Sequence, residues 1–215
     1  MTVAWIHHSL VAMIVPLWYK LVRAARTRRA SRSVAAGVRP VGCFSISSRS
    51  LVTVKDMKHL VIVASLESLT MGASFATSRF PLHMTLVPPF RADCELLALI
   101  AAVKAVSRKI ECMLAEVIGH EQFGPNADIA VALIRPIESV LNAHSRLTEA
   151  LMPLGWAAME PHYNGEGFRP HITSTDDRHV RLGEQFLLNQ IAVIEMLDLP
   201  TVRATYKLAD SLTKR

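Results

Sequence analysis

The chain has 215 residues, 51% of them apolar, which suffices for one packed domain with an extension and excludes a wholly disordered protein. Residues 1–55 contain nine Lys and Arg and no acid. Subtracting those nine from the total of 24 leaves 15 basic residues against all 18 acidic ones in residues 56–215. The net charge of +6 therefore belongs to the N-terminal segment, and it does not indicate that the remainder binds a polyanion.

Three interpretations fit the extension, residues 1–55. Residues 3–19 are apolar and uncharged, marginally long enough to span a bilayer, and the basic run behind them would then leave the following domain in the cytoplasm. Residues 20–50 are rich in Arg and Ser, as in an organellar presequence. Alternatively the start is assigned too early, because Met57 opens a natural first strand. In each case we expect residues 57–215 to carry the chemistry, with membrane contact only through residues 3–22.

The sequence pattern of residues 57–215 predicts a domain of interleaved strands and helices. Short Val- and Ile-rich runs and alternating apolar residues indicate strands, predicted at residues 60–64, 81–89 (ended by Pro88-Pro89), 116–119, 129–134, 171–173, 191–197 and 202–208. Apolar residues at helical spacing predict helices over residues 94–109, with Asp93 as N-cap, and over 138–152, closed near Gly155. No glycine-rich phosphate loop is present, so the pattern predicts an α+β fold.

Two segments of the domain repeat one another. Residues 80–85 read Phe-Pro-Leu-His-Met-Thr, and residues 168–173 read Phe-Arg-Pro-His-Ile-Thr. Each combines a phenylalanine, a proline just before a histidine, and a threonine two residues after it. The matched pair is far more specific than a lone His-x-Thr, which occurs by chance. The repeat indicates two lobes that face each other across a cleft.

The spacing within each repeat has a chemical meaning. Residues i and i+2 of a strand share a face, so His83 would project with Thr85, and His171 with Thr173. Displacement at phosphorus requires a base on one side and an acid on the other, and imidazole titrates in the range that permits both roles. Hydroxyl groups hold phosphate oxygens without adding charge. The arrangement requires no metal, and we expect no cofactor.

These motifs resemble the 2H phosphoesterases, in particular the branch of 2′-5′ RNA ligases and cyclic phosphodiesterases. The resemblance rests on residues 83–90 and 168–173, with support from Phe123-Gly124 and the closing hairpin, and it covers about residues 57–210. It implies two pseudo-symmetric α+β lobes with antiparallel sheets and flanking helices around a central cleft. It also implies an enzyme that opens 2′,3′-cyclic phosphates or 2′-5′ linkages of RNA ends or nucleotides without a metal.

Carried over to this sequence, the resemblance makes His83 and His171 the acid–base pair, and makes Thr85 and Thr173 the phosphate-binding hydroxyls. We favour His171 as the residue that positions the attacking water and His83 as the proton donor to the leaving oxygen. After Thr173 the chain continues Ser-Thr-Asp-Asp, where the family has apolar and small or basic residues. Acids at this place would disfavour long polyanions.

Further substrate contacts are predicted near the motifs. Phe90 and Phe168 are candidates for stacking on a base, Arg169 for a phosphate contact, and Tyr163 for a contact from the glycine-rich loop before the second motif. A zinc site built from His83, His171 and His162 would lack a carboxylate or thiolate ligand, so none is expected.

Two other classes of function stay open on sequence grounds. One is a nucleotide- or RNA-end-binding module of the same fold with little or no catalysis. The other is a membrane-tethered or organellar adaptor in which the extension matters most. We expect a monomer. We also expect a cytoplasmic protein, because the sparse, odd set of cysteines (Cys43, Cys94 and Cys112) indicates reduced thiols.

Overall fold

The structure is a computed structural model that describes residues 58–124, 126–175 and 178–210. The extension 1–55, on which the three interpretations above depend, lies outside these residues, as do Asp176 and Asp177. The strands and α-helices of the described residues are, in chain order, β1 (Lys58–Ser65), β2 (His83–Ala92), α2 (Leu96–Ser107), β3 (Met113–Phe123), β4 (Ile129–Ile134), α3 (Glu138–Leu151), β5 (Ala157–Ala158), β6 (His171–Thr173), β7 (Gln185–Leu188), β8 (Gln190–Glu195) and β9 (Thr201–Lys207).

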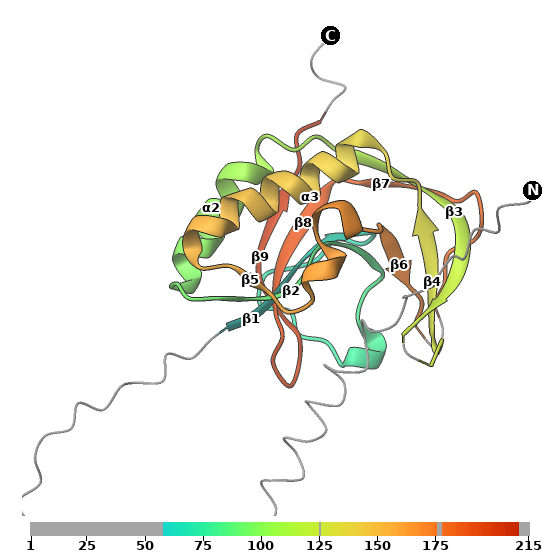
Figure 1. The fold of residues 1–215 in the computed structure, drawn as a ribbon, viewed down its shortest axis with the longest axis horizontal. Coiled ribbons are helices and arrows are strands. Elements are labelled where there is room, and N and C mark those ends of the chain that lie inside the picture. Colours follow the sequence, from blue (N-terminus) through green and yellow to red (C-terminus); the bar gives the residue numbers. More distant parts are fainter. Residues whose placement is uncertain (1–57, 125, 176–177, 211–215) are drawn as a thin grey trace, which may run out of the picture.

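The strands form one antiparallel sheet in the order β7-β3-β4-β6-β2-β1-β8-β9, and β5 pairs with the far end of β2. The junction between β6 and β2 divides the sheet into two halves of four strands each, joined by the pairing of Met84 with Ile172. The sheet curls, and both helices lie along one side of it (Figure 1). The predicted α+β fold of two lobes is confirmed, with the lobes continuous in a single sheet.

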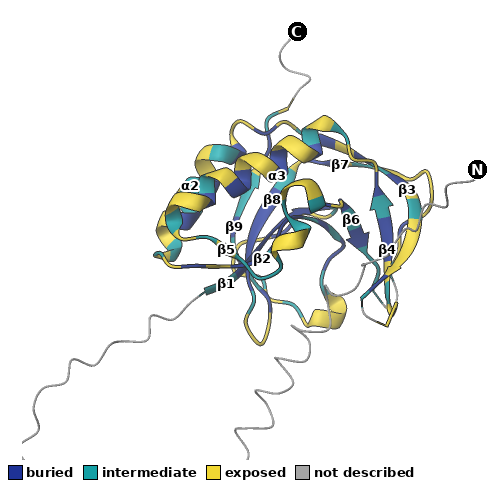
Figure 2. Cartoon of the chain, in the orientation of Figure 1, coloured by how far each residue is buried: buried dark blue, intermediate teal, exposed yellow. Residues whose placement is uncertain are grey.

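One face of the sheet, called here the core face, carries Met84 and Ile172 and packs against the helices. Helix α3 contributes Val140, Leu147 and Leu151, all fully buried, at the helical spacing that the sequence predicted. The helices are exposed along their outer sides and buried where they meet the sheet (Figure 2). Apolar burial on this face holds the two halves of the sheet together.

The opposite face, called here the site face, is partly covered by the segment between β1 and β2. Leu69, Phe75 and Phe80 of this segment pack on Val61 and Val63 of β1 and on neighbouring residues of β8 and β9. The side chain of Gln190 anchors the segment, because it accepts the N–H of Leu69 at 2.8 Å and donates to its carbonyl at 3.2 Å. The site face of β2 and β6 lies beyond this cover.

The prediction that Pro88-Pro89 ends the second strand is wrong, because β2 continues to Ala92. The pairing of β1 with β2 skips at this point, from Leu60 opposite Phe90 to Ile62 opposite Val87. The two prolines fall in this irregularity, where the ladder does not require their missing N–H groups. The carbonyl of Pro89 still accepts the N–H of Met159.

Other boundaries also differ from the sequence predictions. Helix α2 begins at Leu96 after Glu95, so Asp93 is not its N-cap. Strand β3 spans Met113–Phe123 and is therefore longer than predicted, and the edge strand β7 has no counterpart among the predictions. Gly155 takes a left-handed φ of 70° and ends the segment that follows α3, as predicted.

His144 of α3 forms a hydrogen bond with a backbone group of β2 that has no strand partner. Between its contacts with β6 and β5, β2 has no neighbouring strand on this side, and His144 Nδ1–H donates to the carbonyl of Leu86 at 2.7 Å. Its Nε2 accepts the N–H of Gly165 at 3.0 Å, and its ring stacks on Phe168 with centroids 4.1 Å apart. This buried histidine fastens α3, β2 and the loop before β6 to one another.

We predict that His144→Ala lowers the free energy of unfolding by about 2–4 kcal/mol, because it opens a cavity and leaves the Leu86 carbonyl and the Gly165 N–H without partners. Chemical denaturation measures the change. Ser145→Ala, at an exposed position of the same helix, is the control and should change stability by less than about 0.5 kcal/mol. Equal stability of both variants would contradict this role of His144.

Candidate active site

The two repeated motifs meet at the junction of β2 and β6. Because Met84 is paired with Ile172 in antiparallel register, His83 lies across from Thr173, and Thr85 lies across from His171. All four side chains are half-buried on the site face, whereas Met84 and Ile172 are 0% and 1% exposed on the core face. Residues diagonally related across two strands have Cβ atoms about 7–8 Å apart. The structure therefore brings the two predicted histidines and two predicted threonines into one site.

Both imidazoles are held by the same local hydrogen bond. Nδ1 of His83 lies 2.7 Å from the carbonyl of Pro81, and Nδ1 of His171 lies 2.7 Å from the carbonyl of Arg169. A carbonyl only accepts, so each Nδ1 carries the hydrogen, and the Nε2 atoms are left for a ligand. The turn of chain two residues before each histidine thus fixes its tautomer and ring orientation.

The aromatic supports of the two rings differ, although the motifs match. Phe80 meets His83 edge-on at 4.5 Å, but the corresponding Phe168 stacks on His144 in the core. The ring against His171 is Phe123 of β3, at 4.9 Å. The sequence drew attention to Phe123-Gly124 only through the family resemblance, and nothing in its spacing indicated this contact.

Burial depresses the basicity of both histidines. Burial lowers the pKa of His83 to about 4; the hydrogen bond to the Pro81 carbonyl opposes this shift, and the neighbouring His171 adds to it. Burial also lowers the pKa of His171, again against the effect of its carbonyl partner, and the charge of Arg169 contributes in the same direction. The effect of His171 on His83 agrees with the placement of both rings on one face of adjacent strands.

The predicted substrate contacts divide into two groups. Phe90 is 0% exposed and Phe168 is 8% exposed, so the structure places both in the core and not at the site, because their positions take the core side. Arg169 is at the surface: its guanidinium lies over the ring of Phe123, 5.1 Å from the centroid, and pairs with Glu121 at 2.9 Å. Arg169 therefore borders the site through Phe123.

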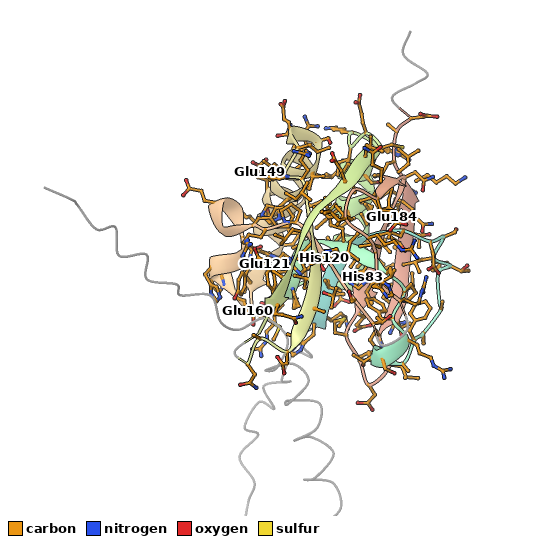
Figure 3. The ribbon with its side chains drawn as sticks, turned by 90° about the vertical axis from the view of Figure 1, so that its right-hand side faces the viewer. His83, His120, Glu121, Glu149, Glu160 and Glu184 are labelled. Carbon is orange, nitrogen blue, oxygen red and sulfur yellow. The ribbon has the colours of Figure 1, made fainter. Side chains whose placement is uncertain are left out.

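Tyr163 lies half-buried in the loop before β6. Its pKa is raised by burial and by the carboxylate of Glu160, and the charge of Arg169 opposes this shift. Glu160 itself has a pKa raised to about 7 by burial. Figure 3 labels His83 of β2, Glu121 of β3 and Glu160 of the loop after β5, and in this view Glu160 lies below Glu121. Sequence analysis did not single out Glu160 or Glu121, because neither lies in a motif.

Two further findings concern other kinds of site. Within residues 58–124, 126–175 and 178–210, no group of three or more His, Cys, Asp or Glu is arranged to hold a metal ion. Over the same ranges, no helix is long and apolar enough to cross a membrane.

Comparison with known proteins identifies the family. A sequence profile of the 2′-5′ RNA ligase superfamily matches residues 62–194, which is more than half of the chain. The chain belongs to this superfamily. The matched segment includes both motifs, so the resemblance inferred from them is confirmed. Comparison with curated proteins finds no significant match.

Three of the solved structures that are similar to this superfamily member each cover more than two thirds of its chain. A crystal structure of a phosphoesterase has 11% identity, a TM-score of 0.48, and coverage of 72% of this chain and 99% of that chain. E. coli LigT complexed with NADP+ has 12% identity, a TM-score of 0.47, and coverage of 71% and 98%. A protein of Thermus thermophilus has 17% identity, a TM-score of 0.47, and coverage of 71% and 99%.

We predict that the protein loses stability as the pH falls from about 6.5 towards 4. The pKa values of His83, His144 and His171 lie below the ordinary 6.5 in the folded state, so the unfolded chain binds more protons over this range. Denaturant midpoints at several pH values measure the effect. His83→Gln should show a smaller drop, and an unchanged drop would contradict the contribution of His83.

Proposed function

We propose that this superfamily member is a phosphodiesterase that opens 2′,3′-cyclic phosphates, or 2′-5′ linkages, of RNA ends or small nucleotides by acid–base catalysis from His83 and His171. The observation that carries the proposal is the placement of two Nε2 atoms and two threonine hydroxyls on one face of adjacent strands. An imidazole pair supplies both a base and an acid, so the chemistry requires no metal ion.

The proposed reaction follows from the geometry. One neutral imidazole accepts a proton from water as the water oxygen forms a bond to phosphorus. The other, protonated imidazole gives its Nε2 proton to the ribose oxygen as the second P–O bond breaks. Thr85 and Thr173, each across from the histidine of the other motif, donate hydrogen bonds to the non-bridging oxygens, which gain charge in the transition state. The product is a phosphomonoester.

A binding module with little catalysis is the second candidate, and the pairing of the arginines near β6 favours it. Arg169 pairs with Glu121, and Arg178 pairs with Glu67, so both cations that flank the strand are already compensated. Such a site would hold a nucleotide but would give weak electrostatic stabilisation to a developing charge. Saturable binding with no product over hours would identify this case.

We predict that His83→Ala and His171→Ala each reduce kcat on a 2′,3′-cyclic nucleotide by about 10²–10⁴-fold, because each removes one proton-transfer group. The unmodified protein should turn over equally in EDTA. Product assays by chromatography measure the rates. His120→Ala is the control, because the ring of His120 is hydrogen-bonded to the carbonyl of Val180, away from the motifs. Wild-type rates in both histidine variants would eliminate the proposal.

Thr85→Val and Thr173→Val should each lower kcat by about tenfold or more, because valine keeps the shape of threonine and removes the hydroxyl donor. Steady-state kinetics with the same substrate measure the loss. The variants should unfold at nearly the same denaturant concentration as the unmodified protein. A loss of activity that only follows a loss of stability would contradict direct phosphate binding.

The pH profile of kcat/KM should be bell-shaped, with its maximum at acidic pH. Turnover requires one neutral and one protonated imidazole, so activity rises as the first pKa, about 4, is passed and falls through a second pKa below 6.5. The two values belong to the pair, so the profile holds for either assignment of acid and base. A plateau that extends above pH 8 would show that the depressed pKa values do not govern catalysis.

A further inference from the structure

Two ion pairs border the site, and each joins segments of chain that lie on opposite sides of a strand. Arg178 pairs with Glu67, and Arg169 pairs with Glu121. Exposed ion pairs contribute little to stability, so their placement around the site is their more informative property.

Glu67 lies on the site face, next to the beginning of β2. The N–H of Leu66 donates to the carbonyl of Leu82, and both of these side chains pack on the core-face cluster. Neighbouring residues of an extended chain point to opposite faces, so Glu67 turns towards the site face. Its N–H donates to Oγ of Ser65 at 3.3 Å, and Ser65 is paired with His83. The carboxylate of Glu67 therefore lies on the β1 side of His83.

Arg178 reaches Glu67 from the other side of β2. Thr173 ends β6, and shortly after it Thr175 and Arg178 face each other in a tight turn, in which the N–H of each donates to the carbonyl of the other. Strands β6 and β1 flank β2 in the sheet, so they are about 10 Å apart. The Arg178–Glu67 pair, called here the strap, therefore crosses β2 near its first residue, His83.

The strap completes a boundary on the His83 side of the site. The segment between β1 and β2 begins at Glu67, is anchored through Leu69 by the side chain of Gln190, and ends at Phe80, whose ring contacts His83. The strap joins the beginning of this anchored segment to the turn after β6. Its two side chains are 38% and 47% exposed, so the boundary lies at the surface, where a long substrate would leave the site.

The second ion pair forms a boundary on the His171 side. Glu121 is paired with Val131, which is paired with Thr173, so Glu121 shares the face of the motif threonine. Strand β4 lies between β3 and β6, so the pair of Arg169 with Glu121 crosses β4. The two motifs thus lie between two ion pairs.

The charges around the site favour a substrate with few phosphates. Glu67 and Glu121 compensate the two arginines that border the motifs. Residues 56–215 contain 15 basic residues against 18 acidic ones. An RNA chain obtains most of its affinity from Lys and Arg that neutralise successive phosphates, whereas a single cyclic phosphate needs no such series.

We propose that the site takes 2′,3′-cyclic mononucleotides and excludes the ends of longer RNA chains, and that the Arg178–Glu67 strap is the group that obstructs the chain. This inference rests on the proposed function and names its substrate class. A mononucleotide ends at its 5′ oxygen. An oligonucleotide continues from that oxygen through further phosphates, which would have to pass the boundary beside the carboxylate of Glu67.

The test compares kcat/KM for 2′,3′-cyclic AMP with kcat/KM for a hexaribonucleotide that ends in the same cyclic phosphate. The unmodified protein should prefer the mononucleotide by about tenfold or more, a difference of about 1.4 kcal/mol. Glu67→Ala/Arg178→Ala removes the strap at constant net charge. It should raise kcat/KM for the hexanucleotide about tenfold and change that for 2′,3′-cyclic AMP by less than about threefold, because both residues are at the surface outside the motifs.

Glu67→Gln separates obstruction from charge. It frees Arg178 to bind a phosphate of the chain, so kcat/KM for the hexanucleotide should rise and should fall more steeply with salt, by about 0.7 in the slope of its logarithm against the logarithm of salt concentration. The double variant should keep the slope of the unmodified protein. A gain in Glu67→Gln without any gain in the double variant would show an effect of charge alone and would overturn the obstruction.

The matched control is Glu116→Ala/Arg135→Ala. These residues also form an exposed ion pair, but it joins β3 to the residue after β4 within one half of the sheet and does not cross β2. The control should keep the preference of the unmodified protein. Equal kcat/KM for both substrates in the unmodified protein, or an equal gain in the control, would overturn the inference and leave the proposed function intact. Turnover of neither substrate would refute the proposed function itself.

Discussion

The pairing of Met84 with Ile172 is the constraint on which the site depends. It is the contact through which the two halves of the sheet join at β2 and β6, and both side chains are buried on the core face. A shift of one residue in either strand would turn its histidine and threonine towards the helices and expose its apolar residue. Apolar burial on one face therefore fixes the geometry of the polar groups on the other.

The short length of β6 determines which groups surround the site. Because β6 begins only at His171, β2 has no strand partner on this side beyond Thr85 until it meets β5, and His144 and the loop before β6 fill the gap. The loop also brings Tyr163 near both Glu160 and Arg169. A longer strand would have closed the sheet there, so the position of His144 and the surroundings of His83 and His171 depend on the same interruption.

The symmetry of the two motifs is local. The backbone hydrogen bond that holds each imidazole is the same, because each lies within two residues of its histidine. The other partners differ. The ring support of His83 is Phe80 of its own motif, whereas that of His171 is Phe123 of β3, and the outer neighbours are Ser65 of β1 and Leu133 of β4. The two histidines therefore have different surroundings although their motifs match.

The sequence by itself determined the α+β class, most strands, both helices and the two His-x-Thr pairs, because period-two and helical spacing are local and the i, i+2 rule needs no partner strand. It could not show that β2 runs through Pro88-Pro89, since the irregular pairing with β1 that tolerates them is set by another strand. The sequence also suggested Phe90 and Phe168 as substrate contacts, although both are buried in the core, because packing between distant segments decides which side of the sheet they occupy. Only the tertiary structure decided that Ser65 and Phe123 join the histidines, because strand register brings together residues that no sequence spacing relates.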